Sequence, residues 1–257
     1  MRKEELKTYI ENHESEMIED LKSLIRIPSE KQAAEPGKPF GAPAAEALAQ
    51  GSRILEKYGF AVTNYDNYAI AADFNGEEKG LDILAHLDVV PAGEGWQETD
   101  PFTPLVKDGK MFGRGTADDK GPAIAAIYAM RAVKELGFPL KKNVRLVLGS
   151  DEECGSSDLE YYYKKETEAP CTFSPDAEFP VINIEKGGMR GHFEKASNAG
   201  TTGVRLVSLQ AGTKLNVVPG KAYAELAGIT KEALKACVDE TEQKTGVSFV
   251  LEDVENG

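Results

Sequence analysis

The pattern of apolar and polar residues divides the first 185 positions into alternating helical and strand-like segments. Apolar residues at helical spacing predict helices over residues 3–27, 42–58, 118–137 and 159–165. Short apolar runs predict strands over residues 61–64, 68–74, 81–87 and 144–148. Two further strands, 102–106 and 110–113, flank Asp108-Gly109, a typical hairpin turn. The alternation indicates an α/β fold with a central sheet flanked by helices and a site beyond the strand ends.

The pattern changes near Lys186-Gly187-Gly188. Beyond this point it predicts strands over residues 189–195, 204–209, 221–226 and 248–251, and a helix over residues 231–244. We therefore expect two domains, residues 1–185 and residues 186–257. The second is of α+β type, and we interpret it as the incomplete beginning of a domain.

Composition and charge favour some classes of protein and argue against others. Apolar residues make up 41% and charged residues 28%, which is ordinary for a folded domain with a buried core. The net charge of -13 argues against a nucleic-acid partner, because phosphate binding requires a basic face. The three cysteines lie far apart and fit a reducing compartment. With a charged N-terminal stretch and no long apolar run, we expect a cytoplasmic protein without a membrane partner.

Two polar motifs stand beside predicted strands or helices in the middle of the chain. His86 and Asp88 end an apolar strand on the same face, where the carboxylate could fix the imidazole tautomer that binds a metal. A histidine satisfied within the core is the simpler alternative. Asp118 and Asp119 stand between glycines before an apolar helix, where a helix cap would also explain them. The two glycine patterns typical of phosphate-binding loops, GxGxxG and GxxxxGK(S/T), are both absent from this stretch.

Two more acidic motifs follow predicted strands. Asp151-Glu152-Glu153 repel one another unless cations or protons compensate, which suits a metal ligand next to a general base or, alternatively, a solvated acidic turn. Asp176 lies in Ser174-Pro175-Asp176, which alone is compatible with an ordinary turn. Strand ends of one α/β sheet converge in space, so the four motifs together indicate one site.

These motifs, in this order, resemble those of the M20 zinc peptidases. The segments are HLDVVPAGEGW from His86, then GRGTADDKGP, SDEECG and SPDAEFPVI. The chain looks most like the N-terminal portion of bacterial dipeptidases of the PepV type, the aminoacyl-histidine dipeptidase class. The resemblance is loose from Leu6 and close from Leu84 to Pro180.

The resemblance implies a site for two divalent metal ions. His86 and Asp176 would hold one ion, Asp118 would bridge both, and Glu153 would hold the second. Nitrogen and oxygen ligands without thiolate suit zinc, with manganese or cobalt as alternatives. Two such ions can activate a water and polarise a scissile carbonyl.

The resemblance also implies the remaining roles. Glu152 would be the general base, and Asp88 would act in catalysis as the partner that orients His86. A cis peptide is implied between Asp118 and Asp119. Asn216 falls where the family's second domain contacts substrate.

The expected activity is therefore metal-dependent hydrolysis of the peptide bond of dipeptides. We expect the chain to depart from the family in two respects. The C-terminal segment that supplies a histidine to the second metal is missing, and so is the segment of the second domain that carries a substrate-contacting histidine. We interpret His13 and His192 as structural or solvated. We expect a truncated form that is inactive alone. The alternatives are N-acyl amino acid deacylation, exopeptidase action, or a non-catalytic metal-binding remnant.

Overall fold

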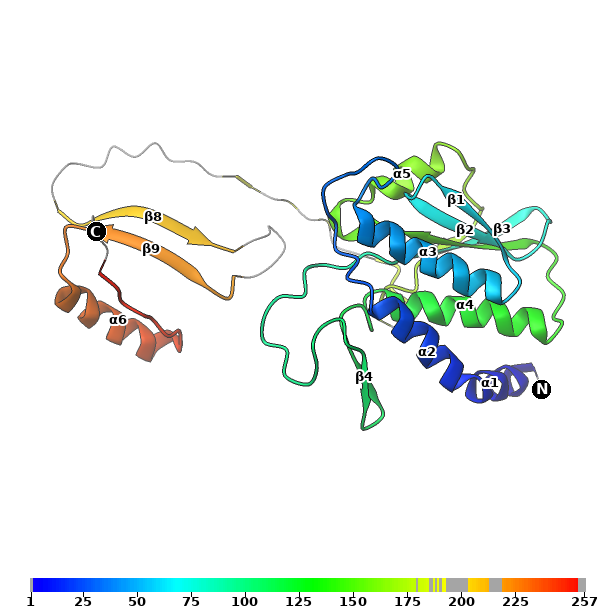
Figure 1. Ribbon diagram of the computed structural model, residues 1–257, viewed down its shortest axis with the longest axis horizontal. Coiled ribbons are helices and arrows are strands. Elements are labelled where there is room, and N and C mark those ends of the chain that lie inside the picture. Colours follow the sequence, from blue (N-terminus) through cyan, green and yellow to red (C-terminus); the bar gives the residue numbers. More distant parts are fainter. Residues whose placement is uncertain are drawn as a thin grey trace. The chain divides into compact units, whose positions relative to one another are not determined.

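The apolar runs within residues 1–185 form a five-stranded mixed sheet, which Figure 1 draws from the computed structural model. The structure describes residues 2–178, 180–184, 187, 189, 191–192, 203–212 and 219–253. The sheet order is β1-β2-β6-β3-β7, with the strands Ala61–Tyr65 (β1), Ala69–Asp73 (β2), Lys79–His86 (β3), Asn143–Gly149 (β6) and Thr172–Phe173 (β7). β3 is parallel to β6 and β7, whereas β2 is antiparallel to β1 and β6. The carboxyl ends of β3, β6 and β7 therefore lie at the same end of the sheet.

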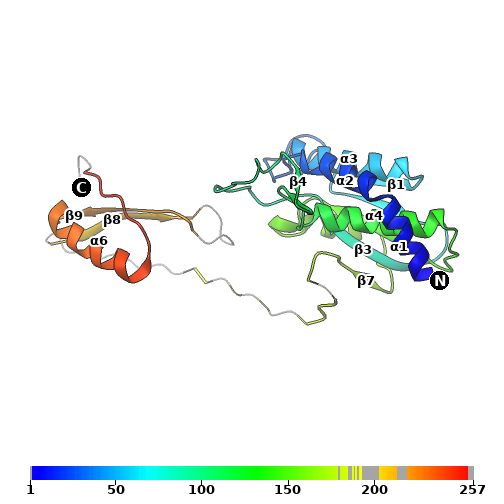
Figure 2. The same ribbon diagram turned by 90° about the horizontal axis from the view of Figure 1, so that it is seen from below.

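Helices cover both faces of this sheet, as the sequence pattern predicts. α3 (Ala42–Lys57) and α4 (Lys120–Glu135) lie side by side over one face, as Figures 1 and 2 show. Leu48 of α3, Ile127 of α4 and Leu146 of β6 belong to the same buried main core. α5 (Ser157–Tyr163) packs on the opposite face through Tyr162.

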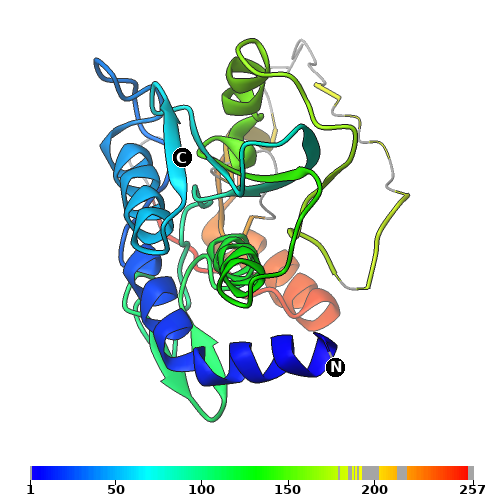
Figure 3. The same ribbon diagram turned by 90° about the vertical axis from the view of Figure 1, so that its right-hand side faces the viewer.

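The single helix predicted over residues 3–27 is wrong in one respect, because the structure has two helices there. α1 (Arg2–Asn12) and α2 (Glu14–Ile25) meet at His13 and pack outside α4, visible in Figure 3. The His13 ring Nδ1 lies 2.7 Å from the carbonyl oxygen of Tyr9, the acceptor that a continuous helix would give to the backbone N–H of His13. That N–H bonds the carbonyl of Ile10 instead, which tightens the turn.

The predicted hairpin is confirmed. β4 (Leu105–Lys107) pairs antiparallel with β5 (Lys110–Phe112). Asp108 and Gly109 have φ angles of 52° and 71°, as the mirror-image turns that suit hairpins require.

The chain divides into two compact units, Met1–Glu185 and Lys186–Gly257. The second contains the antiparallel pair β8 (Arg205–Ala211) and β9 (Ala222–Ala227), followed by α6 (Lys231–Thr245). The strand predicted over residues 248–251 is wrong, because the backbone N–H of Phe249 bonds the Glu242 side chain of α6 and no strand pairs with this run within the described part. The strand predicted over residues 189–195 lies mostly outside the described residues. In the part of the chain that is described, no helix has the length and apolar character to cross a membrane.

Candidate metal centre

Four loops carrying the motif residues meet at the carboxyl ends of the parallel strands. β3 ends at His86, β6 leads into the short 3-10 turn Glu152–Cys154, and β7 is followed by Asp176. Asp118 and Asp119 come directly before α4, which packs on β3 and β6. Because these strands are parallel, residues far apart in the sequence come together at one end of the sheet.

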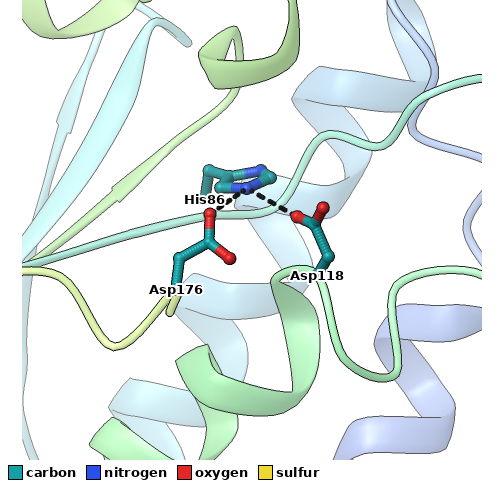
Figure 4. Close-up of side chains that lie close together, drawn as sticks. All are labelled: His86, Asp118 and Asp176. Atoms are coloured by element: carbon teal, nitrogen blue, oxygen red, sulfur yellow. Dashed lines mark ion pairs between the residues drawn. The ribbon is translucent and has the colours of Figure 1, made fainter. Parts of the chain in front are cut away.

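His86, Asp118 and Asp176 form the centre of this group. The His86 Nε2 atom lies 3.2 Å from Asp118 Oδ1 and 3.3 Å from Asp176 Oδ2. Figure 4 marks both ion pairs with dashed lines. The side chain of His86 is only 3% exposed, yet within the described residues Nε2 has no hydrogen-bond partner. One ligand atom from each residue lies within 4.8 Å of the others. An orphaned buried nitrogen facing two carboxylates fits a divalent cation that takes nitrogen and oxygen ligands.

Neighbouring carboxylates control the protonation of His86. Burial lowers the pKa of His86, but Asp118 and Asp88 outweigh burial and raise it to about 12. His86 in turn holds the pKa of Asp118 below its usual range. A proton on the imidazole thus balances the carboxylates, and a metal must displace it, since metals bind the neutral ring.

Asp88 links His86 to the acidic turn. Its side chain is 1% exposed, and Oδ1 lies 3.2 Å from His86 Nδ1. The backbone N–H groups of Glu152 and Glu153 each donate to one Asp88 oxygen, at 3.2 Å. Nδ1 also lies 3.1 Å from the backbone carbonyl oxygen of Asp88. Asp88 therefore orients the ring through both its side chain and its backbone, and its carboxylate fixes the start of the turn.

Asp119 lies behind the centre, a position to which the sequence had given no role. Its carboxylate is fully buried and accepts the backbone N–H of His86 at 2.9 Å. Burial raises the pKa of Asp119 to about 7, although the His86 N–H opposes this. The peptide bond between Asp118 and Asp119 is cis, as expected. The doubled aspartate before the helix was the available signal for this residue.

Glu152 and Glu153 flank the group of three from the turn after β6. Glu152 Oε2 lies 3.8 Å from His86 Nε2, and the Glu152 side chain is half exposed. Burial raises the pKa of Glu152, and the carboxylates of Asp88, Asp176 and Asp118 add to this effect against His86. Burial and then the charge of Asp118 raise the pKa of Glu153, whose carboxylate is not part of the group of three.

A pocket of about 380 Å³ opens beside His86 and Glu152. Its remaining lining mixes polar and apolar side chains and backbone, from Leu84, Ala85, Gly149, Ser156, Asp158, Leu159, Ser174 and Asp176. Asn216 lies outside the described residues, so the structure does not place it. His13 stacks on Tyr9, with ring centroids 4.1 Å apart, far along the chain from the motifs.

Comparison with known proteins gives a consistent result. Residues 83–255 match the family described as Peptidase family M20/M25/M40. The chain is 38% identical over 223 residues to YtjP of Bacillus subtilis (strain 168), covering 85% of this chain and 48% of that protein. It is 36% identical over 242 residues to the Beta-Ala-Xaa dipeptidase of Lactobacillus delbrueckii subsp. lactis, covering 92% of this chain and 51% of that protein. The chain thus spans about half the length of the curated relatives it matches.

A solved structure with the same fold is that of human carnosine dipeptidase 1. The TM-score is 0.58 at 29% sequence identity, and the match covers 66% of this chain and 40% of that one. The mixed sheet flanked by helices is therefore an arrangement that this dipeptidase shares.

Proposed function

Because the chain belongs to peptidase family M20/M25/M40, as its motifs predicted, we propose that it forms the metal-binding part of a dipeptidase. The observation that carries this proposal is the buried Nε2 of His86, which makes no hydrogen bond among the described residues and faces the carboxylates of Asp118 and Asp176. A structural histidine in a core would have both ring nitrogens satisfied, whereas a metal ligand keeps one for the ion.

The donors divide into two sets. His86 and Asp176 would hold one ion, and Glu153 would hold the other. Asp118 would bind both ions. Zinc is the ion that suits these nitrogen and oxygen donors. When bound, a pair of such cations acts as a Lewis acid toward the scissile carbonyl and makes water a stronger nucleophile. Asp88 orients the His86 ring for this role through Nδ1.

Glu152 is the residue we assign to proton transfer. A general base works best when its pKa lies near the working pH, and burial raises the pKa of Glu152 in that direction. Its carboxylate takes a proton from the attacking water and returns it to the leaving amine. Glu152 faces the pocket beside His86, which leaves room for a small peptide.

The names of the relatives support a dipeptide as the substrate class. One is a Beta-Ala-Xaa dipeptidase, and another is a carnosine dipeptidase. We propose that residues 1–185 form the catalytic domain and that residues 186–257 belong to a second domain, in which Asn216 would contact the substrate.

The test is a substrate panel with the complete protein that contains these residues. β-Alanyl and α-aminoacyl dipeptides, a tripeptide and an N-acyl amino acid are compared before and after chelation and re-addition of zinc, manganese or cobalt. We expect dipeptide hydrolysis that chelation removes and metal restores. Preference for the N-acyl amino acid would reassign the substrate class, and the absence of hydrolysis in the metal-loaded protein would refute the proposal.

A further inference from the structure

A lysine outside the motifs reaches the acidic turn from the loop that follows α2. The Nζ atom of Lys31 lies 2.6 Å from Oδ1 of Asp151, whose side chain is completely buried. The Lys31 side chain is 35% exposed, so the ion pair joins a buried carboxylate to a partly exposed ammonium group. The Phe40 ring, 5.0 Å from Nζ, confines the ammonium group.

Asp151 is the residue on which the acidic turn is built. Its second carboxylate oxygen, Oδ2, accepts the hydroxyl of Ser157 at 2.5 Å. Its backbone carbonyl accepts the N–H groups of Cys154 and Ser156, at 3.2 and 2.8 Å. These bonds close the turn Glu152–Cys154, which carries the proposed base and a proposed metal ligand. A shift of Asp151 would therefore move Glu152 and Glu153.

The loop that carries Lys31 also makes hydrogen bonds with the segment that follows β3. The Ser29 hydroxyl donates to the carbonyl oxygen of Leu87 at 2.5 Å, and the N–H of Val89 donates to the carbonyl of Ser29 at 3.2 Å. These contacts flank Asp88, which bonds the acidic turn itself. Residues 29–31 thus connect the segment after β3 with the acidic turn after β6.

Lys31 is also distinctive in charge. Asp88, Asp118, Asp151, Asp176 and the two glutamates of the turn concentrate negative charge at this end of the sheet. Among the residues that the structure describes, Lys31 is the only lysine or arginine in an ion pair with any of these carboxylates. A buried carboxylate without a counter-charge is strongly unfavourable, so the position of Asp151 depends on its ion pair with Lys31.

We propose that Lys31 is a positioning residue that acts through Asp151 to hold Glu152 and Glu153 in place at the metal centre. The inference rests on the proposed function for its activity readout, whereas its metal-binding readout does not require turnover.

The test compares Lys31→Met, which keeps the aliphatic length, with Lys31→Arg, which keeps the charge. Lys38→Met is the matched control, since Lys38 lies in the same loop and pairs only with exposed Glu35 among the described residues. In the complete protein, kcat and KM are measured with a dipeptide, and Co²⁺ binding is followed by its absorption spectrum. We expect Lys31→Met to lower kcat about 10- to 100-fold with little change in KM, and to weaken Co²⁺ binding about tenfold. Lys31→Arg should stay within about threefold of the wild type, because guanidinium can also pair with a carboxylate.

A double-mutant cycle tests the route through Asp151. Asp151→Asn should show the same loss as Lys31→Met, and the double variant should lose no more than either single one. Additive losses would overturn the route, and wild-type kcat in Lys31→Met would overturn the role. If Lys31→Met does not fold, Lys31→Gln replaces it in the kinetic measurement and in the cycle, with the same criteria. If the wild type cleaves no dipeptide, the proposed function fails, and Co²⁺ affinity alone then decides the role of Lys31, with unchanged affinity overturning it.

Discussion

The Nδ1 atom of His86 lies 3.2 Å from Oδ1 of Asp88, and both side chains are almost completely buried. This contact leaves Nε2 as the ring atom that faces Asp118 and Asp176. The two residues should therefore differ in function, since His86 offers a donor to a metal and Asp88 only directs that donor.

Metal analysis of two variants tests this division. His86→Ala should abolish tight binding at the centre, because it removes the only nitrogen of the group. Asp88→Asn keeps the shape of the side chain and should weaken metal affinity by about 10- to 100-fold. Metal content is measured after dialysis against trace zinc, and equal loss of metal in both variants would contradict the assignment.

Glu152 should matter for turnover and not for metal content. In the complete protein, Glu152→Gln should lower kcat by about two to four orders of magnitude, the usual effect of removing a general base. Metal content should remain that of the wild type, whereas the neighbouring variant Glu153→Gln should lose metal. Near-normal turnover in Glu152→Gln would remove Glu152 from the mechanism.

Much of the first unit could be predicted from the sequence because its signals are local. Apolar runs predict the strands β1, β2, β3 and β6. Asp108-Gly109 predicts the hairpin turn, because aspartate and glycine tolerate the positive φ angles that this turn requires. The convergence of His86, Asp118 and Asp176 was also predictable, because each lies at a strand or helix end of one α/β sheet.

The features that the sequence did not reveal depend on contacts distant in the chain. The break at His13 arises from a side chain bonding a backbone carbonyl, and no periodicity in apolar residues records that competition. Residues 248–251 have a strand-like composition, but a strand forms only where a neighbour pairs with it. The pair Lys31–Asp151 joins residues 120 positions apart, and no local pattern identifies it.

The chain of residues 1–257 should bind about one divalent ion tightly, since three donors with room for water make a typical catalytic zinc site. Those donors are His86, Asp118 and Asp176. Glu153 can add only a second carboxylate beside the shared Asp118, without an imidazole, so a second ion should bind weakly. Zinc per chain is measured after dialysis against trace zinc, with Asp176→Asn as the variant that should lose the tight ion. Two tightly held ions would show that another group completes the second site.

The pair of Asp82 and Arg145 should be a major determinant of stability. Arg145 donates from Nε and Nη2 to the two oxygens of Asp82, at 2.9 and 2.7 Å, and both side chains are at most 2% exposed. Asp82→Asn removes the buried counter-charge of the guanidinium, which then keeps only the partly exposed Glu166, 3.3 Å from Nη1. The substitution should cost about 3–5 kcal/mol of the free energy of unfolding. Urea denaturation of the wild type and of Asp82→Asn measures this difference in the free energy of unfolding.

An exposed pair provides the control for that experiment. Glu98 pairs with Lys107, and their side chains are 45% and 51% exposed. Glu98→Gln should change the free energy of unfolding by less than about 1 kcal/mol. A comparably small effect of Asp82→Asn would mean that Arg145 finds another partner or water in the variant.

Glu16 connects α2 to α3 and α4 through two cations. Its Oε2 lies 2.7 Å from Arg131 Nη1, and its Oε1 lies 2.9 Å from Lys57 Nζ. Arg131 and then Lys57 lower the pKa of Glu16 from its usual 4.5 to about 2. Since the folded state then releases this proton more readily than the unfolded chain, the ion pairs stabilise the fold fully only above the unfolded pKa.

The free energy of unfolding should therefore fall as the pH drops from about 4.5 towards about 2, and part of that fall should come from Glu16. Urea denaturation of the wild type and Glu16→Gln at pH 6, 4 and 3 isolates this part. The Glu16 side chain is 37% exposed, so after solvent screening we expect the wild type to be more stable by about 1–2 kcal/mol at pH 6. The difference should shrink towards pH 3, because protonation of Glu16 in the unfolded chain removes the advantage. Glu19→Gln, in an exposed pair on the same helix, is the matched control variant. A difference for Glu16→Gln that stays constant across this range would show that its contacts stabilise α2 without the charge.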